Sequence, residues 1–201
     1  EAPLHSPMTA TITYDGEDIT STGAAEVARK GMVRSFQISA TFAHMSVLEN
    51  VRIALQRPRG DSFSFWRPEK ALSVLDDQAM SLLRDVGLEG DARRLAVELP
   101  YGRKRALELA TTLALDPKLL LLDEPTSGMG REDIARTADL IRRAAEARTV
   151  LMVEHNLSVV SDLSDRITVL ARGEVLAEGP YAEVSKNPAV VEAYMGSDAH
   201  A

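Results

Sequence analysis

The chain has 201 residues, 45% of them hydrophobic and 4% aromatic, with a formal net charge of −7. This length and composition suit one α/β core with a smaller subdomain, exclude a disordered chain and leave no apolar run that approaches a membrane span. The acidic balance argues against nucleic acid as the main partner, because phosphate binding needs clustered Lys and Arg, and the absence of cysteine excludes disulfides and thiolate metal sites.

The N-terminal part predicts a hairpin, a short helix and a strand. Thr9–Tyr14 alternates β-branched and small residues and is followed by Asp-Gly, which favours a hairpin turn. Ser21–Lys30 is typical of a short helix, and Met32–Gln37 of a strand that ends at the polar Gln37. Taken alone, a glutamine at a strand end is more often a solvent-exposed residue without a specific role than a functional group.

The next segment is helical in pattern. Apolar residues recur at helical spacing from Ser46 to Arg57 and again over Glu69–Val86, which Gly87 closes. Between them, Arg59–Pro68 carries a cluster of aromatic residues that either mark a contact surface or pack onto their own subdomain. We therefore expect an inserted helical subdomain within an otherwise α/β chain.

A third helix is expected over residues 99–115, and the sequence LPYGR opens it. The first turn of a helix has N–H groups without helical partners, and the Arg and Lys residues here strengthen its positive field. This helix start is therefore a possible anion site. Considered alone, a basic first turn is more often a solvated surface.

The strongest signal is KLLLLDEPTSGMG, at residues 118–130. Its leucine run, Leu119–Leu122, predicts a strand buried on both faces of a parallel sheet. Asp123 and Glu124 follow directly, and open α/β sheets bind ligands at the carboxyl ends of their strands. The two acids are therefore candidates for metal and water chemistry. The alternative is a solvated strand end with two surface acids.

The C-terminal half predicts a second strand of the buried kind. An amphipathic helix, Glu132–Ala147, leads to Thr149–Val153, which ends just before His155. Because sequential α/β strands are usually neighbours, His155 is expected to share a sheet edge with the two acids. The rest of the chain predicts a brief helix, two strands and a terminal helical stretch, at Leu157–Leu163, Arg166–Leu170, Glu174–Glu178 and from Gly179 to about Met195.

Several of these motifs occur together in the order and approximate spacing of one family. The chain resembles the nucleotide-binding subunits of ABC transporters over about residues 7–195. The resemblance is carried by Gln37, LPYGR, LLLLDEP, SGMG and EHN. Within this family, the chain looks most like the ATPases of branched-chain amino acid importers. The segments that indicate this are RSFQ, MSVLENV, VEHN and the tail from VLARGEV onward. The resemblance implies an α/β fold of the P-loop NTPase type, with a parallel sheet core, an N-terminal antiparallel hairpin and an inserted helical subdomain.

The resemblance also implies a division of the chain. An incomplete RecA-like ATPase core would comprise residues 1–45 and 106–182. The helical subdomain with the signature motif would comprise residues 46–105, and a C-terminal helical tail would comprise residues 183–201. The family's first strand and P-loop are missing, since no G-x-x-x-x-G-K-[ST] occurs in the sequence. In the family that loop precedes the segment matching residues 7–16. We expect a fragment of a longer subunit, the alternative being a truncated product.

Carried over residue by residue, the resemblance implies ATP and Mg²⁺ as cofactors. Asp123 matches the acid that holds Mg²⁺, and Glu124 matches the general base that activates or orients the attacking water. Gln37 matches the glutamine that reaches the metal and the water and links the site to the transmembrane partner. His155 matches the switch histidine near the γ-phosphate. Without the P-loop, the chain alone is expected neither to hold ATP in its own site nor to be active.

Two further segments match family motifs that act across a dimer. The signature motif, which closes over the ATP of the opposite subunit, is matched by the start of the third helix. The matching residues are Leu99, Pro100, Tyr101, Gly102 and Arg103. Pro100 stands at the usual serine position and offers neither a hydroxyl nor an N–H group to a phosphate.

The loop that crosses the dimer seam matches residues 127–130, with Ser127 and Gly128 as its candidate contacts. Gly130 replaces the usual Asp or Asn of this loop. The implied partners are a second ABC ATPase subunit, identical or different, transmembrane permease subunits and, indirectly, a substrate-binding protein. The implied location is peripheral, at the cytoplasmic face of the inner or plasma membrane.

Three functions remain open at this point. The first is an energy-coupling ATPase subunit of an importer of branched-chain amino acids. The second is a non-catalytic subunit that lends its signature motif to a partner ATPase. The third is an ABC ATPase for lipid export or another cargo, which differs from the first only in its membrane partner.

Overall fold

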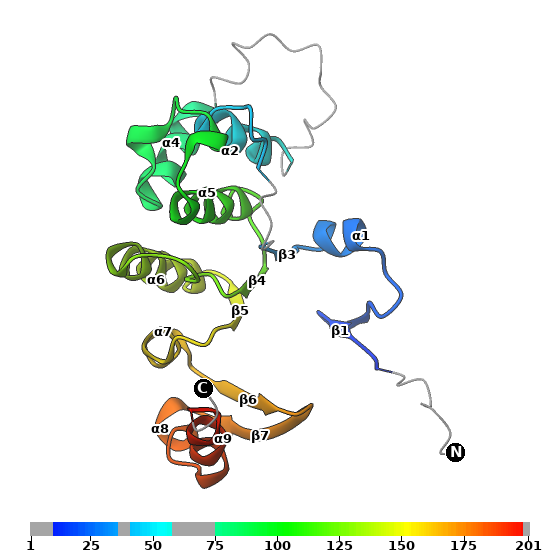
Figure 1. Cartoon of the computed structure of the whole chain (residues 1–201). Helices are drawn as coiled ribbons and strands as arrows, with labels where there is room; N and C mark the ends of the chain where they lie inside the picture. The colour runs from blue at the N-terminus through cyan, green and yellow to red at the C-terminus, as the bar shows by residue number, and fades with distance from the viewer. Residues whose placement is uncertain (1–9, 36–40, 58–74, 199–201) are drawn as a thin grey trace, which may run out of the picture.

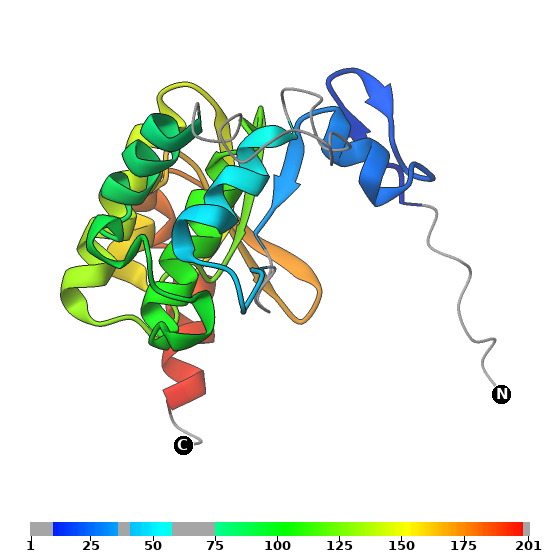
Figure 2. The ribbon, with the colours of Figure 1, turned by 90° about the horizontal axis from the view of Figure 1, so that it is seen from above.

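A computed structural model describes residues 10–35, 41–57 and 75–198. Gln37, the aromatic segment 59–68 and the first part of the helix expected from Glu69 lie outside the described residues. Figure 1 shows the helices α2, α4 and α5 above a small sheet, the helix α6 beside that sheet, and a separate C-terminal lobe below it. Seen from above, the N-terminal hairpin projects to one side of this body (Figure 2).

The N-terminal hairpin forms as predicted. The strands β1 (Thr13–Tyr14) and β2 (Glu17–Asp18) pair antiparallel. Asp15 and Gly16 between them have φ angles of 51° and 80°. Two successive positive φ angles are typical of the tight turn that matches the twist of a hairpin. The short helix α1 (Ala24–Arg29) follows, also as predicted.

The central sheet is parallel and has the order β3-β4-β5. Its strands are β3 (Met32–Arg34), β4 (Leu119–Asp123) and β5 (Thr149–Val153). Asp123 lies opposite Val153 in the register of β4 and β5. The carboxyl ends of the strands therefore meet at one edge, which confirms the predicted neighbourhood of the two later strands and the α/β class with a parallel sheet.

The helical part packs α2 (Val47–Gln56) and α4 (Asp76–Asp85) against α5 (Tyr101–Leu113). Helix α2 begins with a capping box, in which the Ser46 hydroxyl accepts the Glu49 N–H group at 3.2 Å and the Glu49 carboxylate accepts the Ser46 N–H group at 2.7 Å. Two short 3-10 turns, η2 (Glu89–Asp91) and η3 (Ala96–Glu98), join α4 to α5. The proposed boundary between residues 105 and 106 falls inside α5.

One hydrophobic core joins this helical part to the sheet. Leu107 of α5 and Leu120 of β4 are both fully buried in it, and Leu122 is 2% exposed. The neighbouring Leu119 and Leu121 are only half-buried. The alternation means that β4 buries one face completely, so the expectation of burial on both faces is wrong.

The expectation that β5 is a buried strand is also wrong. Leu151 and Val153 are 61% and 62% exposed. Among the described residues, β5 pairs only with β4, so its other edge is open. Helix α6 (Arg131–Ala145) packs against β5, and the face that carries the two exposed residues is uncovered.

The C-terminal lobe matches the predicted order of elements. After α7 (Leu157–Leu163), the strands β6 (Ile167–Ala171) and β7 (Glu174–Gly179) pair antiparallel as a sheet of their own. The helices α8 (Tyr181–Val184) and α9 (Pro188–Asp198) complete the lobe (Figure 1). Across the described ranges, no helix combines the length and the apolar composition needed to cross a bilayer.

Candidate functional site

The carboxyl edge of the sheet brings three of the predicted site residues together. Asp123 ends β4, Glu124 follows it, and His155 lies two residues beyond the end of β5. The Glu124 N–H group donates to the Val153 carbonyl at 2.8 Å, which holds the two strand ends together. The Nδ1 atom of His155 lies 3.5 Å from Oε1 of Glu124. Gln37 lies outside the described residues.

Glu124 and His155 are open to solvent, with side-chain exposures of 38% and 71%. Glu124 also has a φ angle of +45°, in a region that side chains other than glycine rarely adopt. Such backbone strain is concentrated at functional sites, where the surrounding structure holds it in place. The turn that follows supplies this support, because the Ser127 N–H group donates to the Glu124 carbonyl at 3.1 Å.

Asp123 forms an ion pair that the sequence analysis missed. Nη2 of Arg34, the last residue of β3, lies 2.9 Å from Oδ2 of Asp123. The signal was an arginine at the end of a strand that neighbours a strand ending in aspartate, but it becomes visible only once the strand order is known. Arg34 therefore compensates the charge that Asp123 brings to the edge.

The side chains at this edge could supply one carboxylate ligand of a Mg²⁺ ion. Mg²⁺ is commonly held by one or two carboxylates, with water and substrate phosphates completing its shell. Asp123 can supply such a carboxylate, in competition with Arg34. Over the described ranges, no three His, Cys, Asp or Glu side chains gather as a metal site. The remaining ligands of an ion here would come from water and phosphate.

Glu154, between β5 and His155, was also missed, although it stands inside the EHN motif. Its side chain is 0% exposed. Oε1 accepts the Thr126 N–H group at 3.1 Å and the Thr126 hydroxyl, and Oε2 accepts the His155 and Asn156 N–H groups at 2.9 and 3.0 Å. Burial alone raises the pKa of the Glu154 carboxyl, but these hydrogen bonds outweigh burial and leave the pKa below its ordinary value.

The structure places the predicted signature residues at the start of α5. Leu99 is 3% exposed and belongs to the core. Pro100 is the N-cap residue and makes no side-chain capping hydrogen bond. Tyr101 and Gly102 form the first turn, and the described hydrogen bonds and ion pairs link none of these residues to Asp123, Glu124 or His155.

Arg103 is held within the helical part. Its guanidinium pairs with Asp91 of η2, whose other carboxylate oxygen lies 3.0 Å from Nη1 of Arg94. The Asp91 side chain is 7% exposed. Burial raises the pKa of Asp91, but the hydrogen bonds from Arg103 and Arg94 outweigh it, so the pKa lies below its ordinary value. Asp91 thus ties the end of the predicted signature motif to the turn before it.

The predicted seam loop packs on the predicted signature motif of the same chain. A Cβ atom at Gly128 would lie 2.7 Å from Cε1 of Tyr101, closer than real Cβ atoms approach other atoms. The φ angle of Gly128 is +71°, which side chains other than glycine adopt at a cost. The Arg105 guanidinium lies 5.8 Å from the centroid of the same ring. The loop and the helix start are thereby held together.

Gly128→Ala is expected to lower the free energy of unfolding by about 1–2 kcal/mol. Alanine is unfavourable in the left-handed backbone conformation, and its Cβ atom would also collide with the Tyr101 ring. Gly130→Ala is the matched control, since Gly130 has an ordinary φ of −73° and nothing within 4 Å of its Cβ position. Urea unfolding of the two variants measures the difference. Equal stability of both variants would contradict the packing of Gly128 on Tyr101.

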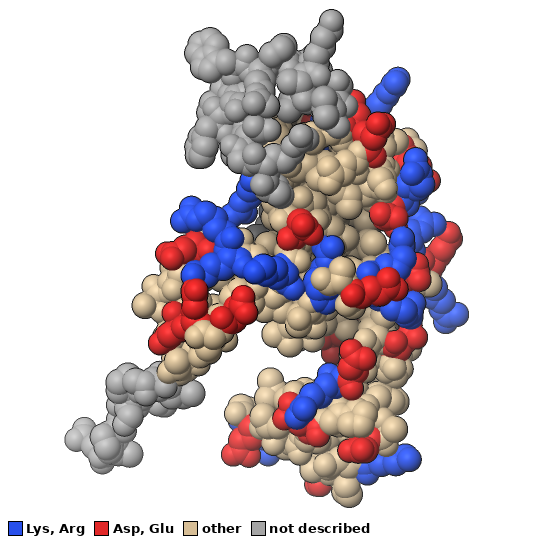
Figure 3. Space-filling view, turned by 180° about the vertical axis from the view of Figure 1, so that it is seen from behind, with Lys and Arg blue, Asp and Glu red and all other residues tan. Residues whose placement is uncertain are grey.

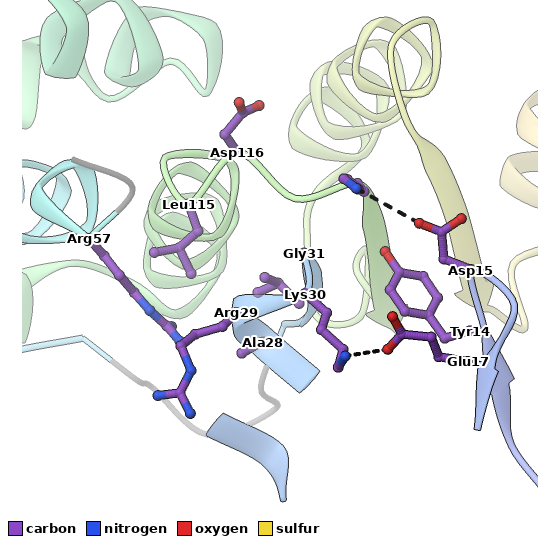
Figure 4. A pocket seen from close by; sticks show the side chains of 12 residues that line it. Tyr14, Asp15, Glu17, Ala28, Arg29, Lys30, Gly31, Arg57, Leu115 and Asp116 are labelled. Atoms are coloured by element: carbon purple, nitrogen blue, oxygen red, sulfur yellow. Dashed lines mark hydrogen bonds and ion pairs between the residues drawn. The ribbon is translucent and has the colours of Figure 1, made fainter. Parts of the chain in front are cut away.

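A cavity lies elsewhere in the described structure, at the amino ends of the strands (Figure 4). Its volume is about 560 Å³, and its lining includes Gly31 and Lys118, which precede β3 and β4. Two ion pairs lie in this lining, with Lys30 bound to Glu17 and Nζ of Lys118 3.9 Å from Oδ2 of Asp15. The cavity therefore lies at the end of the sheet opposite to Asp123 and is separate from the candidate site.

Surface charge does not single out another site on the face shown in Figure 3. Lys and Arg side chains form a band across the middle of that face, with Asp and Glu side chains among them. The described part of the chain also has several exposed ion pairs, such as Arg143 with Asp85 at 3.0 Å. Exposed pairs of this kind contribute little free energy, so the carboxyl edge of the sheet stays the candidate site.

A parallel sheet with two acids and a histidine at its carboxyl edge, joined to a helical part, is the arrangement of an ATP-binding cassette. The profile of the ABC transporter family matches residues 2–127, and that of the branched-chain amino acid ATP-binding cassette transporters matches residues 174–200. The chain belongs to the ABC transporter family.

Among its relatives is the high-affinity branched-chain amino acid transport ATP-binding protein BraF of Pseudomonas aeruginosa, 34% identical over 206 residues. The corresponding protein LivG of Salmonella typhimurium is 35% identical over 200 residues. Each alignment covers 96% of this chain and 78% of the relative. The ADP conformation of MJ1267, an ATP-binding cassette of an ABC transporter, superposes with a TM-score of 0.71 at 27% identity, covering 91% of this chain and 75% of that one.

Proposed function

We propose that this chain is the ATP-binding, energy-coupling subunit of an ABC importer for branched-chain amino acids. The observation that carries the proposal is the contact between His155 and Glu124 beside Asp123, at the carboxyl edge of a parallel sheet. The names of BraF and LivG, both branched-chain amino acid transport ATP-binding proteins, support the cargo class.

In the proposed reaction, Glu124 accepts the proton of the attacking water or orients that water for in-line attack on the terminal phosphate. His155 contacts Glu124 and is exposed to solvent, so it is free to donate to the same phosphate. Asp123 would hold Mg²⁺, which when bound offsets phosphate charge. Gln37 is proposed to reach the same metal and water from the segment after β3.

The proposed partners follow from the segments that act across a dimer in this family. The first turn of α5, from Leu99 to Arg103, would contact the nucleotide of a second ATPase subunit, and Ser127 and Gly128 would lie at the seam. Transmembrane permease subunits would anchor the pair at the cytoplasmic face of the membrane, and a substrate-binding protein would act through them. The second ATPase subunit would be either identical or different.

One observation favours a second candidate function, a non-catalytic subunit that lends its signature motif to an intact ATPase. The start of α5, which carries the predicted signature motif, is formed and packed. A contact made in trans needs only that helix start.

A fusion tests the first function. The chain is joined in frame to an N-terminal segment that contains a G-x-x-x-x-G-K-[ST] loop, taken from an intact ABC ATPase, and Mg²⁺-dependent ATP hydrolysis is measured for the fusion and for the chain alone. We expect hydrolysis by the fusion only, with no hydrolysis when its P-loop lysine is changed to alanine or when EDTA removes Mg²⁺. A folded fusion without hydrolysis would contradict the proposal.

A mixing experiment tests the second function. The chain alone is titrated into intact BraF, whose turnover is followed at a fixed ATP concentration. A saturable change in BraF turnover that depends on residues 99–103 would support the lending of the signature motif. Unchanged turnover over the whole titration would remove this candidate.

A further inference from the structure

The backbone ladder between β4 and β5 stops just before the candidate site. Its last described bond runs from the Glu124 N–H group to the Val153 carbonyl. Beyond that point, no described backbone hydrogen bond joins the segment after Glu124 to the segment after Val153. The Glu154 carboxylate makes the next connection, and it is a side-chain connection.

On the β4 side, the partner of Glu154 is Thr126, two residues after Glu124. Both the N–H group and the hydroxyl of Thr126 donate to Oε1 of Glu154. Thr126 is itself only 5% exposed, and its carbonyl accepts the Met129 N–H group at 3.2 Å. Glu154 therefore fixes the start of the loop that carries Gly128.

On the β5 side, Oε2 of Glu154 accepts the N–H groups of His155 and Asn156. Asn156 in turn begins α7, because its Oδ1 accepts the N–H groups of Ser158 and Val159 at 3.2 and 3.5 Å. The backbone that carries the His155 imidazole is thereby held between the carboxylate and a capped helix.

We propose that Glu154 is a positioning residue that fixes the spacing between Glu124 and His155. The proposal deepens the function proposed above and, in its catalytic part, rests on it. The Glu154 side chain is fully buried, so it acts through the two residues it places. It also links the predicted seam loop to the predicted switch histidine within one chain.

The chemistry of the site requires a carboxylate. Four donors converge on two oxygen atoms, two on each. Glutamine has the same shape but offers one oxygen and one NH₂ group, which is a donor. Toward residues 155 and 156, the NH₂ group of Glu154→Gln would face two N–H donors. Toward Thr126, it could donate to the hydroxyl but would leave the Thr126 N–H group without an acceptor, and buried donors left without acceptors are costly. The isosteric change therefore breaks one half of the bridge.

The first test uses the chain itself, without nucleotide. Amide hydrogen exchange is compared between the parent chain and Glu154→Gln, with Glu178→Gln as control, because Glu178 forms an exposed ion pair with Arg166. We expect exchange to rise on the order of tenfold or more, the effect of losing about 1.4 kcal/mol of protection, on the side that the NH₂ group faces. That side is either the amide of residue 126 or the amides of residues 155 and 156. The control should leave these amides unchanged.

A second readout follows the histidine. In the parent chain, Glu124→Gln should shift the NMR signals of the His155 ring, which are assigned by their loss in a His155→Gln variant. In the Glu154→Gln background the same change should produce a clearly smaller shift, because the two side chains are no longer held in contact. A merely structural residue that supported the fold elsewhere would not remove this response.

The proposal is overturned if Glu154→Gln leaves both the three amides and the His155 response as in the parent. Should Glu154→Gln fail to fold, Glu154→Asp keeps the carboxylate but is one methylene shorter, so it cannot reach both segments. Faster exchange at residue 126, or at residues 155 and 156, then supports the proposal, and unchanged exchange at all three residues overturns it.

The catalytic part is read in the fusion described above. Glu154→Gln should lower kcat on the order of tenfold or more while KM for ATP stays within about twofold, because positioning acts on the reacting geometry. If the parent fusion is inactive, the proposed function fails while the exchange and NMR results still decide the role of Glu154. An active fusion whose kcat is unchanged by Glu154→Gln would overturn the catalytic part.

Discussion

Glu124→Gln is expected to lower the Mg²⁺-dependent ATP hydrolysis of the P-loop fusion by at least about a hundredfold, the usual range for loss of a general base. Glutamine keeps the size of the side chain and tolerates the same backbone, so the strained φ angle at this position is retained. It cannot accept a proton from water. ATP binding should therefore persist while turnover is lost.

The control for this prediction is Glu132→Gln. Glu132 lies in the first turn of α6, its side chain is 88% exposed, and its ion pair with Arg136 is a surface one. Steady-state hydrolysis gives the loss of turnover, and a fluorescent ATP analogue gives binding. If the Glu124 variant kept turnover within a few-fold of the parent, Glu124 would not be the base, and another group at this edge would carry that role.

The second large effect is expected in the core of the chain. Leu120→Ala should lower the free energy of unfolding by about 3–5 kcal/mol, because Leu120 is fully buried and its removal leaves a cavity between the sheet and α5. For a chain with the marginal stability of most domains, this is a large fraction of the total. Urea unfolding followed by circular dichroism measures it.

Leu121→Ala is the matched control on the same strand. Leu121 is half-buried and points to the other face of the sheet, so its removal should cost about 1 kcal/mol, in proportion to the smaller area it buries. Comparable losses for both variants would mean that the second face of β4 is covered as well, and would contradict the one-sided burial of this strand.

Much of the fold could be predicted because local signals and chain order agree. The Asp-Gly turn specified the hairpin, and the leucine run specified β4. The rule that sequential strands of an α/β chain are neighbours was enough to place Glu124 and His155 at one edge. These predictions need only the residues of each element and its position in the chain.

The errors and omissions have a common cause in contacts between elements. An apolar run such as Thr149–Val153 looks the same whether or not another element covers it, so the exposure of Leu151 and Val153 could not be read from its pattern. Arg34 and Glu154 were missed because each acts through a partner far away in sequence, Asp123 and Thr126 respectively. The roles assigned to Gln37 and to residues 99–103 stay predictions.

The open side of β5 affects how the chain behaves in solution. Its backbone groups there have no described partner, and β6, which belongs to a separate two-stranded sheet, lies on the side of its hairpin that is nearer to β5 (Figure 1). Leu151, Val153 and Leu170 add exposed apolar side chains. Unpaired strands of this kind recruit strands from other molecules. The folded chain should therefore self-associate as its concentration rises, under conditions in which it does not yet unfold. A peptide that pairs with the open edge of β5 as an added strand should keep the chain monomeric.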